Sequence, residues 1–150
     1  MTGLRVGTDI GGTKTDAVAV RPDGTIEQQL RLPTGFGPDA VIASAVTAVT
    51  ELAVLCGIPV TAFDSIGVGI PGAVDTTTGR VSHAVNLGVD ELDLGSELSV
   101  RLGRPVRVEN DVKAAALGAF HLLGTDPAHS MAYLNLGTGL AAGLVIGGEL

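Results

Sequence analysis

Cysteine, lysine and tryptophan are scarce in this sequence of 150 residues, which contains one cysteine, two lysines and no tryptophan. Cys56 alone cannot form an internal disulfide, and it cannot supply the roughly four ligands that a structural zinc site needs. The net charge is -7, whereas a nucleic-acid surface needs clustered lysine and arginine to contact phosphates. We therefore expect no nucleic-acid partner.

Long apolar runs are also missing. No stretch of roughly 18 or more consecutive apolar residues occurs, and the N-terminal residues do not combine a basic segment with an apolar stretch and a cleavage site. We therefore expect no membrane partner, no signal peptide and a cytoplasmic location. Hydrophobic residues still make up 45% of the chain, which is enough to bury a sizeable core.

The first half of the chain predicts three strands, a helix and a further strand. Alternating segments rich in β-branched residues indicate strands over residues 4–10, 15–20 and 25–32, joined as an antiparallel meander. Apolar residues at helical spacing indicate a helix over residues 38–56, followed by the stop signals glycine and proline. Residues 65–70 form a short apolar run without alternation, as expected of a parallel strand buried on both faces.

Alternation of helices and strands continues after a glycine-rich loop. The pattern indicates a helix over residues 92–102, a short strand over residues 106–109 and an alanine-rich helix over residues 112–123. The resulting order is β-β-β-α-β-α-β-α. It predicts an α/β fold with a mixed five-stranded sheet covered by helices.

Two further strands are expected over residues 131–136 and 141–146. We expect one domain over residues 1–123, and the first strands of a truncated second lobe over residues 124–150. A two-stranded ribbon is marginally stable alone and exposes edges that can pair with another chain. A homodimer or a higher oligomer is therefore expected.

Asp9, two glycines, Thr13 and Lys14 form a candidate phosphate-binding turn. Gly11 and Gly12 lie where the chain reverses between two strands, and glycine lets backbone amides approach an anion closely. Thr13 adds a hydroxyl and Lys14 an ammonium group. A carboxylate such as Asp9 at the end of a buried strand is costly without a partner, and Mg²⁺ or its water shell is a suitable one. The alternative is an ordinary hairpin turn, for which paired glycines are common evidence.

A second threonine flanked by glycines, Thr138, follows the strand expected at residues 131–136. With Gly139 it repeats the chemistry of the first turn. Two such turns, each within a set of strands, suggest a nucleotide bound between two lobes. The alternative is a tight bend with no ligand.

Asn110 and Asp111 lie where a strand gives way to a helix. Both residue types are favoured helix N-caps and need no other reason to be there. The carboxyl end of a strand in an open α/β sheet is also where ligands bind. A helix N-terminus favours an ionised Asp111, as required of a base, and the Asn110 amide suits recognition of a polyol. Gly72 follows a proline at the end of another buried strand, and Asn86 lies in the loop after it.

Four stretches in this order resemble the ROK family of bacterial sugar kinases and sugar-responsive repressors, within the actin and hexokinase superfamily. They are residues 9–14, 69–75, 110–111 and 136–143. The resemblance covers essentially the whole chain but only the first half of such a protein, and it implies a ribonuclease H-like domain of the actin-like ATPase type. It also implies roles for individual residues: Asp111 as general base, Gly72, Asn86 and Asn110 as ligands of sugar hydroxyls, and Thr13, Lys14, Thr138 and Gly139 around the phosphates.

The activity that the resemblance implies is transfer of a phosphoryl group from ATP, with Mg²⁺, to a hydroxyl of a hexose such as glucose. Three alternatives stay open: a sugar-responsive transcriptional regulator, an inactive sugar-binding domain, and a kinase that uses polyphosphate. Regulators of this family carry a DNA-binding segment before the first phosphate motif, which here begins at residue 9, so a kinase is favoured.

The family's zinc-binding cysteines and its remaining sugar ligands would lie beyond Leu150. We therefore expect the 150-residue chain alone to have little or no kinase activity, because phosphoryl transfer depends on two lobes that bring donor and acceptor into line.

Overall fold

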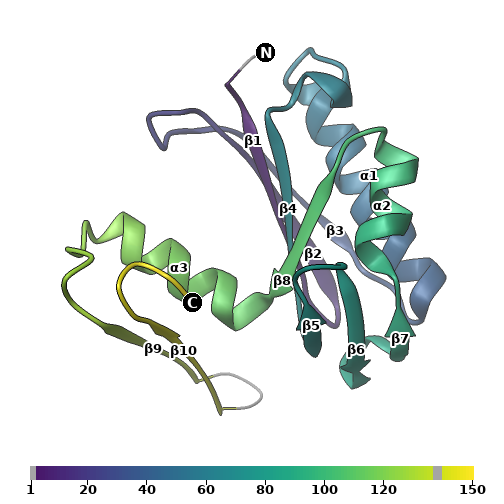
Figure 1. Cartoon of the computed structure of the whole chain (residues 1–150). Helices are drawn as coiled ribbons and strands as arrows, with labels where there is room; N and C mark the ends of the chain where they lie inside the picture. Colours follow the sequence, from purple (N-terminus) through teal and green to yellow (C-terminus); the bar gives the residue numbers. More distant parts are fainter. Residues whose placement is uncertain (1–2, 137–139) are drawn as a thin grey trace. The chain divides into compact units, whose positions relative to one another are not determined.

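A mixed five-stranded sheet organises the first of two compact units of the chain (Figure 1). The computed structural model describes residues 3–136 and 140–150, and the units are residues 1–109 and 110–150. The strand order is β3-β2-β1-β4-β8. The first three strands form the antiparallel meander, and β4 runs parallel to β1. The bounds are β1 (Arg5–Ile10), β2 (Lys14–Val20), β3 (Ile26–Pro33), β4 (Ser65–Ile70) and β8 (Val106–Asn110).

Two helices, α1 (Pro38–Leu55) and α2 (Leu94–Leu102), lie side by side in the first unit (Figure 1). Helix α1 packs on β1, β2 and β3, and its buried face includes alanines that allow close approach to the sheet. It is long and apolar enough to pass for a membrane span by length and composition alone, but it buries one face inside the unit, as core helices do. Each fully buried valine or leucine in this core stabilises the fold by roughly 1.5–3 kcal/mol.

Alternation along β1 separates its two sides. Val6, Thr8 and Ile10 are buried, whereas Arg5 and Asp9 are exposed. Because successive side chains of a strand point to opposite faces, Asp9 lies on the other face of β1 from the buried core residues. Asp9 ends a strand with a buried face, but its own side chain is exposed, so the cost of a buried carboxylate does not apply to it.

A three-stranded antiparallel sheet follows β4 where the sequence pattern indicated only a glycine-rich loop. Its order is β5-β6-β7, with β5 (Ala73–Asp75), β6 (Arg80–Ala84) and β7 (Val89–Leu92). The 3-10 turns η1 (Val60–Ala62) and η2 (Val85–Leu87) precede β4 and β7 respectively. These strands contain three to five residues each, which is too short for a clear alternating pattern.

The second unit consists of α3 (Asp111–Leu122) and an antiparallel ribbon of β9 (Met131–Leu136) and β10 (Leu140–Val145). Ala116, Phe120 and Val145 form its small core. Gly143 of β10 lies against α3, since a Cβ there would be 2.5 Å from the Cβ of Ala116. Helix α3 therefore groups with the ribbon, and the compact units divide after residue 109, whereas the expected domain boundary was after residue 123.

The predicted fold class is confirmed. The five strands of the mixed sheet, the helices between them and the final ribbon occur in the predicted order, with the small sheet β5-β6-β7 added. Most predicted bounds agree with the structure within two residues.

Candidate functional site

A backbone hydrogen bond closes the tight turn between β1 and β2. The N–H of Gly11 donates to the carbonyl of Lys14 at 2.9 Å. Neither Gly11 nor Gly12 has a positive φ, so the left-handed conformation is not why glycine is present. A Cβ on Gly11 would be only 3.1 Å from the Lys14 carbonyl. Gly12, Thr13 and Lys14 are exposed, and so are accessible to an anion.

A chain of buried hydroxyl groups lies behind this turn. Ser44 of α1 donates to the hydroxyl of Thr15 at 2.7 Å, and the hydroxyls of Thr15 and Thr34 are 2.9 Å apart. The N–H of Thr34 donates to the carbonyl of Thr13 at 3.2 Å. Because buried polar groups are costly unless they are hydrogen-bonded, this network links the turn to α1 and to the end of β3.

Asp9 and Asp16 are cross-strand partners on the same side of the sheet. Like charges placed opposite each other destabilise a sheet unless they are compensated. Arg31 of β3 compensates Asp16 through two hydrogen bonds of 2.5 and 3.2 Å. These bonds also raise the pKa of Arg31 above its usual value. Asp9 lies near the end of β1 and Lys14 begins β2, so the two residues lie on either side of the turn. The exposed carboxylate of Asp9 is a suitable oxygen ligand for Mg²⁺ or its water shell.

Residues 82–88, the end of β6 and the turn η2, are named here the η2 segment. A Cβ on Gly12 would be 3.4 Å from the carbonyl oxygen of Asn86 and 3.6 Å from its Cβ. The candidate phosphate turn and the candidate sugar ligand Asn86 are therefore direct neighbours within the first unit. Asn86 is exposed, so its amide is accessible to a ligand.

Gly72 packs against the same η2 segment. Its φ is 103°, and a Cβ there would be 2.6 Å from the carbonyl oxygen of Ser82 and 3.1 Å from the nitrogen of Ala84. Only glycine fits this position without strain. Between those two residues, His83 has a φ of 57°. A left-handed conformation costs a non-glycine residue about 1–2 kcal/mol. The η2 segment therefore contains a backbone conformation that the rest of the fold must stabilise.

Asp75 fixes the turn that leads from β5 into β6. Its carboxylate accepts hydrogen bonds from the N–H groups of Thr77 at 2.9 Å and Thr78 at 3.4 Å. The Thr77 bond is the largest cause that lowers the pKa of Asp75, followed by the side chain of Thr78. The role of this residue is structural: it closes the turn after the Pro-Gly loop.

Asn110 and Asp111 open the second unit at the N-terminus of α3. The Asn110 side-chain oxygen accepts hydrogen bonds from the N–H groups of Val112 at 3.1 Å and Lys113 at 3.2 Å, as an N-cap does. Asp111 accepts a bond from the Val112 N–H at 2.8 Å. Both side chains are half-buried.

Two predicted residues lie outside the part of the chain that the structure describes. They are Thr138 and Gly139 of the second glycine-flanked turn. The other predicted residues fall into two groups: Asp9, the 11–14 turn, Gly72 and Asn86 in the first unit, and Asn110 with Asp111 in the second. Sequence spacing could not reveal the contact between Gly12 and Asn86, because 74 positions separate them in the chain.

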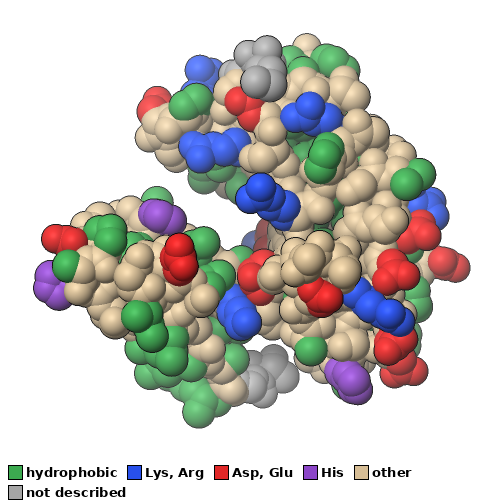
Figure 2. Space-filling view, in the orientation of Figure 1, with side chains coloured by type: hydrophobic (Ala, Val, Ile, Leu, Met, Phe, Trp, Pro, Cys, Tyr) green, Lys and Arg blue, Asp and Glu red, His purple; other side chains and the backbone are tan. Residues whose placement is uncertain are grey.

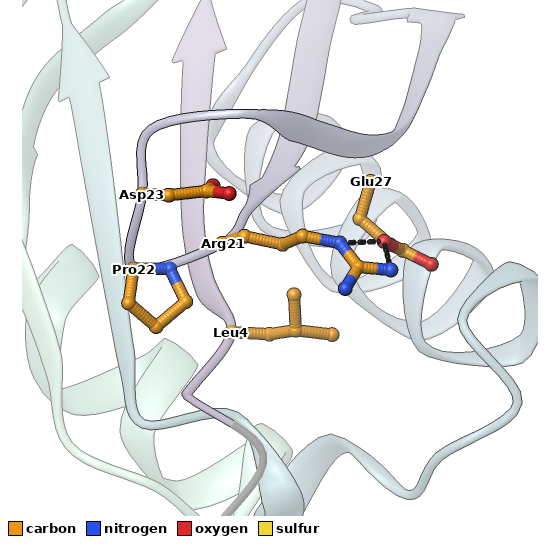
Figure 3. Close-up of a pocket in the computed structure, with 5 residues that line it drawn as sticks. All are labelled: Leu4, Arg21, Pro22, Asp23 and Glu27. Atoms are coloured by element: carbon orange, nitrogen blue, oxygen red, sulfur yellow. Dashed lines mark hydrogen bonds and ion pairs between the residues drawn. The ribbon is translucent and has the colours of Figure 1, made fainter.

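An open pocket of about 380 Å³ lies away from these residues (Figure 3). Its lining comes from the start of β1 and the hairpin between β2 and β3, whereas the candidate phosphate turn follows the other end of β1. Arg21 reaches across it and forms an ion pair with Glu27. The pocket contains none of the predicted site residues. The lining residues are Leu4, Arg21, Pro22, Asp23 and Glu27.

Similar proteins are sugar kinases and a repressor. A glucokinase from Streptomyces coelicolor is 35% identical over 148 residues, which cover 99% of this chain and 45% of that protein. A putative xylose repressor from Caldicellulosiruptor is 29% identical, over 99% of this chain and 38% of that protein. The chain therefore spans less than half the length of these relatives.

Solved structures agree with this similarity. The structure of a ROK family glucokinase from Streptomyces griseus, in complex with glucose and AMPPNP, matches 98% of this chain with a TM-score of 0.86 at 31% identity, over 46% of that protein. An inorganic polyphosphate/ATP-glucomannokinase from Arthrobacter matches with a TM-score of 0.79 at 29% identity, over 98% of this chain and 60% of that protein. The ROK family model matches residues 5–150. The chain belongs to the ROK family.

Proposed function

We propose that this chain supplies the first half of a kinase that transfers the γ-phosphoryl group of ATP to a hydroxyl of a glucose-like hexose. The observation that carries the proposal is the closeness of Gly12 to Asn86. It sets a turn suited to phosphate beside a loop suited to a sugar. The names of the relatives favour the same reaction, since a glucokinase and a glucomannokinase are among them.

In the proposed reaction the acceptor hydroxyl oxygen forms a bond to the γ-phosphorus, and the bond between that phosphorus and the ADP oxygen breaks. Asp111, at the N-terminus of α3, accepts the proton of the hydroxyl as general base. Asn110, Gly72 and Asn86 bind sugar hydroxyls. The phosphates lie along the 11–14 turn and contact Thr13 and Lys14, and along the second turn they contact Thr138 and Gly139.

Asp9 is the proposed residue for Mg²⁺, held through water. Its exposed carboxylate offers the oxygen ligands that this ion prefers. When bound, the ion neutralises charge on the phosphates. Zinc has no proposed site in this chain, because Cys56 is its one cysteine. Burial raises the pKa of the Cys56 thiol, which disfavours the thiolate that metal binding needs.

Two other functions have a specific observation in their favour. The similarity to a putative xylose repressor favours a sugar-responsive regulator. The similarity to a polyphosphate/ATP kinase favours polyphosphate as an alternative donor. Titration with polyphosphate in place of ATP, and a DNA-binding measurement with and without glucose, separate these possibilities from an ATP-specific kinase.

The experiment that tests the proposal uses the two lysines of the chain. Calorimetry measures the affinity of the 150-residue chain for Mg²⁺-ATP, for glucose and for N-acetylglucosamine. We expect Lys14→Ala to weaken ATP binding about tenfold, because hydrogen bonds to charged groups contribute roughly 1.5–3 kcal/mol. Lys113→Ala is the matched control, since Lys113 is the other exposed lysine, and it is expected to bind ATP as the unmutated chain does.

Equal ATP affinity of the two lysine variants would contradict the proposed phosphate site. A coupled assay on the same samples measures ATP-dependent glucose phosphorylation. We expect little or no turnover by this chain alone, and robust turnover would overturn the idea that it is half of the catalytic unit.

A further inference from the structure

Phe36 differs from the other phenylalanines of the chain. Phe63 and Phe120 are buried at 0% and 2% exposure, whereas Phe36 is 74% exposed. The chain is poor in aromatic residues, with three phenylalanines, one tyrosine and no tryptophan. An exposed phenylalanine leaves a large apolar surface in water, so its position relative to the proposed site is informative.

The loop that carries Phe36 connects β3 to α1 beside the proposed phosphate turn. Strands β1 and β3 each pair antiparallel with β2, so both run in the same direction and end at the same edge of the sheet. At that edge the N–H of Thr34 donates to the carbonyl of Thr13. The loop therefore begins in contact with the proposed phosphate turn.

The far end of the same loop is attached to the η2 segment. The N–H of Gly37 donates to the carbonyl of Leu87 at 2.8 Å. The ring of Phe36 lies against Gly88, where a Cβ would be 2.4 Å from Cε1 and 2.5 Å from Cζ of the ring. A side chain on Gly88 would overlap the ring, so glycine at that position allows this approach, and the φ values of 67° at Gly88 and 95° at Gly37 also favour glycine. Phe36 is thus held by backbone hydrogen bonds on both sides while most of its ring stays exposed.

We propose that Phe36 is a further sugar-binding residue, whose ring forms an apolar platform for the C–H face of a pyranose. The inference rests on the proposed function, because it requires that Asn86 bind a sugar. Asn86 and Gly88 are two residues apart in the η2 segment, so the amide and the ring border the same stretch of backbone. Ligand sites combine apolar and aromatic surface with a few polar groups. A pyranose has both a polar edge and an apolar face, and it fits this combination.

A purely structural role is the competing explanation, in which Phe36 only covers Gly88. The two explanations differ in their dependence on an aromatic ring. Leucine at position 36 keeps an apolar cover over Gly88 but removes the flat ring, whereas tyrosine keeps the ring. A structural role also predicts that loss of Phe36 disturbs the neighbouring phosphate turn, and so ATP binding, as much as it disturbs sugar binding.

Calorimetry with glucose and with Mg²⁺-ATP on the 150-residue chain tests the inference. We expect Phe36→Ala and Phe36→Leu to weaken glucose binding about three- to tenfold, Phe36→Tyr to keep it within about twofold, and all three to keep ATP affinity within about twofold. Val54→Ala is the control, since Val54 lies on α1 with the same exposure of 74%. It is expected to change neither affinity.

Each remaining outcome decides the question. Unchanged glucose affinity in Phe36→Ala, glucose binding by Phe36→Leu as tight as by the unmutated chain, or equal losses of glucose and ATP affinity would overturn the inference and leave the proposed kinase function standing. If the unmutated chain binds neither glucose nor N-acetylglucosamine, this would overturn the inference together with the sugar-binding part of the proposed function.

Discussion

Three glycines near the proposed site differ in how closely their surroundings would meet a side chain. A Cβ on Gly11 would crowd the Lys14 carbonyl at 3.1 Å, whereas a Cβ on Gly12 would meet Asn86 at 3.4 Å, which is an ordinary contact. Gly72 combines a positive φ with close contact to β6. Packing therefore explains part of what looks like a ligand-binding pattern in the sequence. Gly12 is relevant to both packing and the proposed function, because its neighbour Asn86 is a proposed sugar ligand.

Gly72→Ala tests how rigid this packing is. We expect the variant to lower the free energy of unfolding by about 2 kcal/mol or more, because the new Cβ meets backbone atoms of β6 in a conformation that already strains alanine. Gly24→Ala is the control: its φ is 87°, and a Cβ there meets nothing within 4 Å, so only the backbone strain of about 1–2 kcal/mol remains. Urea denaturation measures both, and equal losses would show that the η2 segment yields to the extra methyl group.

At the scale of elements, the strongly periodic segments could be predicted from the sequence, whereas the short strands could not. Helix α1 and strand β4 were recognisable from their apolar patterns, and their bounds agree with the structure within one residue. The sheet β5-β6-β7 was not recognisable, because β5 has three residues and the end of β7 was assigned to the following helix. Of the proposed sugar residues, Asn86 lies in the turn η2, and Gly72 directly precedes β5 and packs against β6. Its contacts with residues 12 and 36 join distant parts of the chain, and no local pattern encodes them.

Helix α3 and strand β10 provide a paired test of packing in the second unit. We expect Gly143→Ala to lower its free energy of unfolding by about 2 kcal/mol, because the added methyl group would lie 2.5 Å from the Cβ of Ala116 and overpack the contact. We expect Gly118→Ala to raise it by about 0.5–1 kcal/mol, because Gly118 is an exposed position inside α3 with open space around it.

Hydrogen exchange of the α3 amides measures both variants. A gain of stability in Gly143→Ala would contradict the close packing of β10 on α3, and a loss in Gly118→Ala would contradict the open space around Gly118.

At the scale of the whole molecule, the outer face of the β9-β10 ribbon is apolar. Register places Leu136 opposite Leu140, Leu134 opposite Ala142, and Ala132 opposite Leu144. The side of the ribbon that contacts α3 carries the alternate residues, Tyr133, Gly143 and Val145 among them. The four leucines of the outer face are exposed, and apolar side chains gather on this unit in Figure 2. Contiguous apolar patches of this kind are interaction surfaces or aggregation sites.

We expect the outer face of the ribbon to mediate self-association of this chain. The double variant Leu134→Lys, Leu144→Lys is expected to weaken dimerisation at least tenfold, because each leucine that leaves water contributes roughly 1.5–3 kcal/mol and each added charge must be desolvated. Val100→Lys is the control, since Val100 is an isolated apolar residue on α2 with 81% exposure, outside the ribbon. Light scattering coupled to size-exclusion chromatography over a dilution series measures the change. The net charge of -7 opposes association at low salt, so the dimer should strengthen as salt is added, and a monomer at every salt and protein concentration would contradict the prediction.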